Sequence, residues 1–157
     1  MILETRHTGI VVQDMEKSLH FWRDVMGLKI TVDFREKGAF IDTVQGLSGV
    51  DLRMIKLTAP DGSMIELLQD AAHPMPAAKQ NRLCDRGIRH VAFTVADVEV
   101  AWRTLSDTGC EVLSEPVTSP DGKARLFFAR DPEGNLMELV QMLGGMTDQA
   151  VVKESNL

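Results

Sequence analysis

The chain contains two copies of one pattern, and this repeat limits its possible folds more than any other feature. The segment HTGIVVQD, which begins at His7, matches HVAFTVAD, which begins 83 residues later at His90. A second pair, GSMIELLQ around Glu66 and GNLMELVQ around Glu138, is separated by 72 residues. Both pairs occur in the same order, so the chain is predicted to consist of two similar modules. The first module has 11 more residues between its histidine and its glutamate, and we expect them within Asp33–Leu52.

Each copy is predicted to form a βαβββ module. Short β-branched and apolar runs indicate a first strand over 8–12 and 91–95. An aspartate at a helix-capping position and apolar residues at helical spacing predict helices over Met15–Met26 and Val98–Thr108. Runs bounded by Pro and Gly turns predict the remaining strands over 28–34, 52–58, 63–69, 111–113, 124–129 and 135–141.

The sequence therefore predicts an α+β fold in which paired βαβββ modules form a curved mixed sheet. The expected organisation is a first module at 1–70, a linker at 71–87, a second module at 88–142 and a flexible tail at 143–157.

Composition and charge exclude several classes of protein. The formal net charge is −6, whereas a general nucleic-acid binder needs a basic surface. No run approaches the ~18 apolar residues that a membrane span needs, and charged residues follow Met1 too early for a secretory signal. We therefore expect a cytoplasmic protein that takes a small-molecule substrate, binds neither nucleic acid nor membrane, and keeps Cys84 and Cys110 reduced.

Four residues of the repeat carry candidate chemistry: His7, Glu66, His90 and Glu138. Each glutamate lies between apolar residues of a predicted strand, and each histidine begins one. A buried carboxylate is unfavourable unless its charge is compensated. Because imidazole and carboxylate recur together in both modules, we predict that the four residues bind one divalent metal ion, such as Zn²⁺, Ni²⁺, Co²⁺ or Mn²⁺. The alternative for each residue is a purely structural role.

The motifs around these residues resemble the vicinal oxygen chelate superfamily, which includes glyoxalase I, methylmalonyl-CoA epimerase, extradiol dioxygenases and bleomycin-binding proteins. The resemblance covers residues 5–142 and rests on HTGIVVQD with the helix that follows it, on IRHVAFTVAD around His90, and on DPEGNLMEL around Glu138. It implies the glyoxalase-like fold of paired modules and the four metal ligands predicted above. A glutamate at position 66 makes the chain similar to the glyoxalase I branch.

The resemblance also implies an activity. The expected function is that of a metal-dependent lyase or isomerase of the glyoxalase I type, which moves a proton on a small α-hydroxycarbonyl compound or its thiol adduct through a metal-bound enediolate. Glu138 and Glu66 are the candidate catalytic residues, and the repeat makes them near equivalents. In such proteins a second subunit often completes the site, so we expect a homodimer.

Departures from the family pattern leave alternatives open. Val11 and Asp70 stand where glutathione-using enzymes often carry Arg and Asn, so the use of glutathione is not decided. The chain has no tyrosine, which disfavours the dioxygenase branch. The alternatives are an epimerase of the methylmalonyl-CoA kind and a metal-free small-molecule binding or resistance protein.

Three cationic residues are candidates for binding an anionic part of the substrate. Arg53 and Arg125 lie on predicted central strands, and Lys123 lies beside one. The alternative for all three is a solvated strand face.

Overall fold

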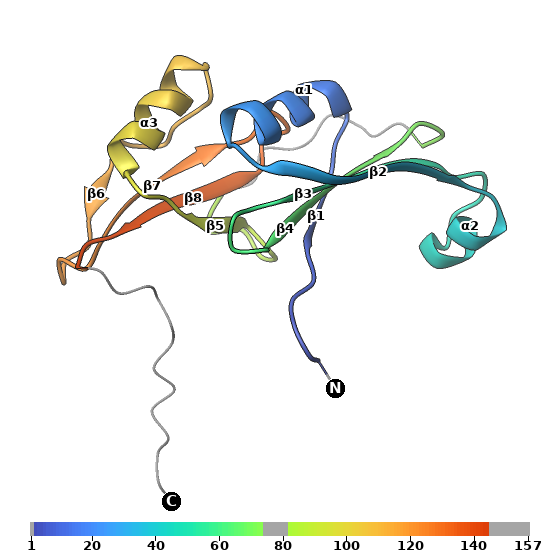
Figure 1. Ribbon diagram of the computed structural model, residues 1–157, viewed down its shortest axis with the longest axis horizontal. Helices are drawn as coiled ribbons and strands as arrows, with labels where there is room; N and C mark the ends of the chain where they lie inside the picture. Colours follow the sequence, from blue (N-terminus) through green and yellow to red (C-terminus); the bar gives the residue numbers. More distant parts are fainter. Residues whose placement is uncertain (1, 74–81, 145–157) are drawn as a thin grey trace, which may run out of the picture. The chain divides into compact units, whose positions relative to one another are not determined.

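The computed structural model describes residues 2–73 and 82–144, and the chain divides into two compact units (Figure 1). The first unit holds β1 to β4 together with the turn Asp131–Gly134, and the second holds β5 to β8. The central part of the predicted linker (74–81) and nearly all of the predicted tail (145–157) lie outside the described residues. No helix in the described ranges is both long and apolar enough to cross a membrane.

The first unit is a four-stranded mixed sheet with helices on both faces. Its strands follow the order β1-β4-β3-β2, with β1 parallel to β4 and the other pairs antiparallel. Its elements are β1 (Thr8–Val11), α1 (Met15–Leu19), the π-helix η1 (His20–Val25), β2 (Lys29–Lys37), α2 (Ala39–Gln45), β3 (Asp51–Thr58) and β4 (Met64–Asp70).

The second unit repeats this topology with the strand order β5-β8-β7-β6. Its elements are β5 (His90–Thr94), α3 (Val98–Asp107), β6 (Val117–Thr118), β7 (Ala124–Arg130) and β8 (Leu136–Met142). The predicted α+β class and the pairing of two βαβββ modules are confirmed. The predicted strand at 111–113 is reduced to one bridge between Val112 and Ala129, and the edge strand forms at 117–118 instead. Pro116 lies between the two segments and has no N–H to donate to a continuous ladder.

The helix that follows the first strand begins at the same place in each unit because an aspartate caps it. The Asp14 carboxylate accepts a hydrogen bond from the Lys17 backbone N–H at 3.0 Å. The Asp97 carboxylate accepts from the backbone N–H groups of Glu99 and Val100 at 2.9 and 3.0 Å. Such side-chain oxygens satisfy donors that the first helical turn leaves unpaired.

The extra residues of the first unit form α2 and its flanking loops, inside the predicted range 33–52. The helix ends at Gly46, whose φ of 67° is the left-handed conformation that favours glycine at a helix C-terminus. Its buried residue Ile41 packs with Val50 and Leu52.

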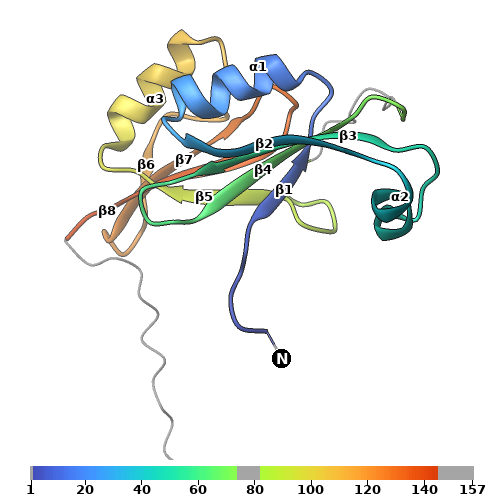
Figure 2. The same ribbon diagram turned by 45° about the vertical axis from the view of Figure 1, so that its right-hand side comes forward.

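Strand alternation gives the first sheet two different faces. Ile55 and Leu57 of β3 pair with Leu67 and Ile65 of β4, and all four side chains are buried. Figures 1 and 2 show α1 over one face of this sheet and α2 on the other, at the end of β2. Since successive side chains point to opposite faces, Glu66 lies on the face away from α1.

Candidate metal centre

The first predicted pair of ligands comes together at the start of β1. Gly9 of β1 lies directly beside Glu66 of β4, so His7, two residues earlier, points to the same face as that glutamate. The His7 Nε2 atom is 3.0 Å from Glu66 Oε2. The histidine side chain is 27% exposed and the glutamate side chain only 8% exposed. A carboxylate on a strand between apolar residues is thus buried against an imidazole.

The second unit repeats this pair with a more open glutamate. Ala92 of β5 lies beside Glu138 of β8, in the register that Gly9 and Glu66 have in the first unit. The distance from His90 Nε2 to Glu138 Oε2 is 3.2 Å, and the side chains are 39% and 21% exposed. The two modules therefore present the same donor atoms in the same local arrangement.

Both pairs have the chemistry and the spacing that a divalent ion needs. Imidazole nitrogen and carboxylate oxygen bind such ions at about 2.1 Å, so two ligands at neighbouring octahedral positions lie about 3 Å apart. The distances of 3.0 and 3.2 Å agree with this spacing. One feature departs from most metal-bound histidines, in which the second ring nitrogen donates to a partner. The Nδ1 atom of His7 is buried and has no hydrogen-bond partner among the described residues.

The four predicted ligands lie in two separate His–Glu pairs. Within residues 2–73 and 82–144, no group of three or more His, Cys, Asp or Glu side chains is placed to hold a metal ion. Each His–Glu pair belongs to one unit, His7 with Glu66 in the first and His90 with Glu138 in the second. A centre of four ligands remains a prediction from the sequence.

Lys56 is a residue of the site that the sequence analysis missed. It lies on β3 directly opposite Glu66, and its Nζ atom is 3.4 Å from Glu66 Oε1. The two oxygens of this carboxylate therefore face different partners, His7 on one side and Lys56 on the other. A signal was present in the sequence, because the hairpin turn at Asp61–Gly62 sets the register that places position 56 across from position 66.

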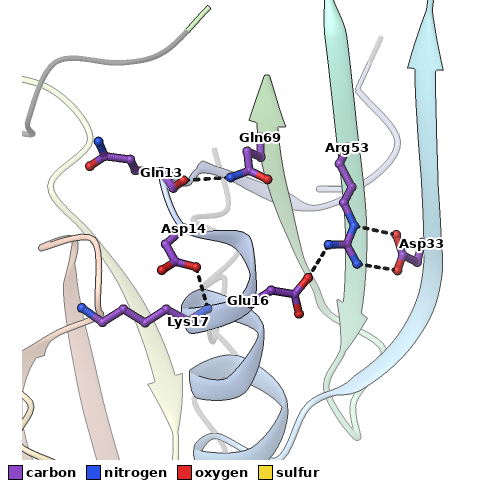
Figure 3. A network of polar contacts seen from close by, with 7 residues as sticks. All are labelled: Gln13, Asp14, Glu16, Lys17, Asp33, Arg53 and Gln69. Atoms are coloured by element: carbon purple, nitrogen blue, oxygen red, sulfur yellow. Dashed lines mark hydrogen bonds and ion pairs between the residues drawn. The ribbon is translucent and has the colours of Figure 1, made fainter. Parts of the chain in front are cut away.

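The three predicted substrate-binding cations lie elsewhere in their units. Arg53 is on the α1 side of the first sheet, where its guanidinium binds the carboxylates of Asp33 and Glu16 (Figure 3). The hydrogen bonds that this guanidinium donates, first to Asp33 and then to Glu16, hold the pKa of Arg53 above its ordinary value.

Arg125 makes an equivalent contact in the second unit, where its guanidinium binds Glu99 in the first turn of α3. Lys123 is exposed, and its Nζ lies 3.9 Å from Asp121 Oδ2. A role of these three residues in substrate binding stays a prediction.

Two cavities of the first unit lie away from the predicted ligands. A cavity of about 560 Å³ is lined by polar residues that include Asp14, Lys17 and Glu133. A smaller one of about 190 Å³ lies beside Val11, Asp70 and His73, and the His73 ring is 2.7 Å from the Asp70 carboxylate. Neither is lined by His7 or Glu66.

Comparison with known proteins places this chain in one family. Residues 5–139 match the family model of the Glyoxalase/Bleomycin resistance protein/Dioxygenase superfamily. The chain therefore belongs to this superfamily.

Individual relatives agree with this assignment but carry different names. A probable lactoylglutathione lyase from Synechocystis is 28% identical over 86% of this chain and 92% of its own length. An ethylmalonyl-CoA/methylmalonyl-CoA epimerase from Cereibacter sphaeroides is 29% identical over 90% of this chain and all of its own length. The crystal structure of a glyoxalase family protein from Bacillus cereus is 27% identical, has a TM-score of 0.84, and covers 92% of this chain and 97% of its own.

Proposed function

We propose that this protein is a metal-dependent enzyme that moves a proton on a small α-hydroxycarbonyl compound or on its thiol adduct, as glyoxalase I does. The observation that carries the proposal is the repeated His–Glu pair, with Nε2 to Oε2 distances of 3.0 and 3.2 Å. In this proposal, His7 and His90 would bind a divalent cation through Nε2, and Glu66 and Glu138 through one carboxylate oxygen each. The chemistry that such a cation supplies is stabilisation of negative charge on two neighbouring substrate oxygens.

We assign the proton transfer to Glu138 rather than to Glu66. Glu66 is the more buried of the two and has an ion-pair partner for each of its oxygens. Glu138 is more exposed, and the residue opposite it on β7 is Phe128, which offers no charge. A carboxylate that is less restrained can take a proton from the carbon beside the carbonyl and return it. Return to the neighbouring carbon isomerises the substrate.

A second candidate reaction is epimerisation, in which the proton returns to the opposite face of the same carbon. The relative from Cereibacter sphaeroides supports it, because that protein is named as an epimerase of ethylmalonyl-CoA and methylmalonyl-CoA and aligns over its whole length. Isomerisation needs one carboxylate, whereas epimerisation needs a second acid on the opposite face of the carbon, and Glu66 would be that acid. The substrate also distinguishes the two reactions. The cytoplasmic location and the homodimer expected from the sequence remain proposals.

Uptake of solvent deuterium tests both reactions. The purified protein, supplied in turn with Zn²⁺, Ni²⁺, Co²⁺ or Mn²⁺, is incubated in D₂O with hemithioacetals, with 2-oxo compounds and with acyl-CoA thioesters, and deuterium in the recovered substrate is measured by mass spectrometry. We expect exchange with one of these three classes of compound. The exchange rate of Glu138→Gln should be lower than that of the parent by at least about 100-fold, because a general base contributes that much or more. Glu36→Gln, a substitution of the same kind on β2, is the control.

Exchange at the parent rate in Glu138→Gln would refute the assignment of the base. A parent protein that binds a cation but exchanges no class of substrate would refute the proton-transfer function and favour a binding or resistance protein.

A further inference from the structure

Lys56 places a positive charge beside one of the two His–Glu pairs. Its side chain is only 17% exposed, so most of the aliphatic stem is buried while the ammonium reaches Glu66. The Nζ to Oε1 distance of 3.4 Å is longer than the 2.7–3.2 Å of a good N–H···O hydrogen bond. Among the residues that the structure describes, the Lys56 ammonium forms its ion pair with Glu66. An ammonium carries three donors, so donors remain for a ligand.

The second unit shows that a His–Glu pair does not need this lysine. Phe128 occupies the equivalent position, directly opposite Glu138. Its ring lies edge-on to the His90 ring, with centroids 5.4 Å apart. The His90–Glu138 contact forms at 3.2 Å without any cation across from the glutamate. The charge at position 56 is therefore specific to one half of the candidate centre and is not a requirement of the repeated fold.

We propose that Lys56 positions the substrate by donating hydrogen bonds to an anionic oxygen, so that the substrates carry a carboxylate that supplies one of the two vicinal metal-binding oxygens and turns its other oxygen toward the ammonium. This inference rests on the proposed function, because it assumes that Glu66 binds a cation through the oxygen that faces His7. The oxygen facing Lys56 then shares the ammonium with the substrate. A charged hydrogen bond in a mostly buried setting favours an anionic group over a neutral group of the same shape.

Lactate and lactamide test this role, since they share a skeleton and a pair of vicinal oxygens but differ in charge. Binding of each probe to the Mn²⁺-loaded protein is measured by the paramagnetic broadening of its methyl proton signal. In Lys56→Met we expect an affinity for lactate about tenfold lower, because a charged hydrogen bond is lost. We expect the affinity for lactamide to change less than about twofold, and Lys56→Arg to retain most of the preference for lactate.

Controls separate this role from folding and from the proposed function. Lys29→Met, the same substitution at an exposed position of β2, is expected to leave both affinities unchanged. Thermal unfolding of each variant checks that it folds. Lactate binding that is unaltered in a folded Lys56→Met protein would overturn the role of Lys56 and leave the metal centre intact. A parent protein that binds no Mn²⁺, Zn²⁺, Ni²⁺ or Co²⁺ would overturn the proposed function itself, and the role of Lys56 with it.

Discussion

At the scale of single residues, two arginines at equivalent positions of the repeat connect a central strand to a helix. Arg53 of β3 binds Glu16 in the first turn of α1, and Arg125 of β7 binds Glu99 in the first turn of α3. A glutamate in this turn also interacts favourably with the positive end of the helix dipole. The arginines therefore fix the helices over the sheets, on the faces opposite to the His–Glu pairs.

Replacing Arg53 should affect stability and not the metal centre. We expect Arg53→Met to lower the free energy of unfolding by about 1–2 kcal/mol, because the hydrogen bonds to two partly exposed carboxylates are lost. Arg125→Met should cost less, since Arg125 pairs with one carboxylate. Urea unfolding measures the loss, and elemental analysis of the folded variants checks their metal content. An Arg53→Met protein of parental stability that no longer binds metal would contradict this division of roles.

The sequence could predict which side chains are candidate ligands, but not every neighbour of the site. His7 and Glu66 were found because a charge inside an apolar strand needs a partner and the same charge recurs in the second module. Lys56 was missed because its place depends on the register of the β3–β4 hairpin, and the second module has Phe128 at the equivalent position, so the repeat did not mark it. The charge of Arg53 made it a candidate for substrate binding, but charge alone could not predict that it shares the α1 face of the sheet with Ile55 and Leu57.

At the scale of elements, α2 distinguishes the two units. Asp42 of this helix accepts hydrogen bonds from the backbone N–H groups of Gly49 and Val50, both at 2.9 Å. These two bonds hold the pKa of the Asp42 carboxyl below its ordinary value. The carboxylate thus joins α2 to the start of β3 and stabilises the fold in its ionised form.

The lowered pKa of Asp42 predicts a pH-dependent effect of its replacement. A group whose pKa is lower in the folded state adds stability above its unfolded pKa of about 3.9, and this stability is lost as the pH falls through the folded value. We therefore expect Asp42→Asn to be less stable than the parent at pH 7, with the difference shrinking below about pH 4. Urea unfolding between pH 7 and pH 3 measures it. A difference that stays constant over this range would show that the charge of Asp42 plays no part.

Two elements were not predicted correctly: the helix in the insertion was not assigned, and one edge strand was misplaced. The number of residues between the repeated motifs located the insertion within 33–52. Its short apolar runs could not show that it forms the helix α2, because such runs do not distinguish a helix from a strand. The helix starts at Met15 and Val98 were predicted correctly, because a capping aspartate is a local signal. The edge strand was misplaced, since edge pairing depends on contacts across the sheet that a sequence window does not contain.

At the scale of the whole molecule, two copies of one module present two copies of one His–Glu pair. Neither pair alone provides the three or four ligands that a catalytic metal site usually has. The chain shares its superfamily with relatives named as a lyase and as an epimerase. The proposed function therefore rests on the prediction that His7, Glu66, His90 and Glu138 bind one divalent ion together.

Metal content per chain tests this claim most directly. The parent, Glu66→Gln and Glu138→Gln are each dialysed against Zn²⁺, Ni²⁺, Co²⁺ and Mn²⁺, freed of loose metal and analysed by inductively coupled plasma mass spectrometry, with Glu36→Gln as the control. We expect about one ion per chain in the parent and the control, and a metal affinity at least tenfold weaker in both glutamate variants, because each removes a charged ligand. A parent that retains none of the four cations, or a glutamate variant that retains its ion at parental affinity, would contradict the account.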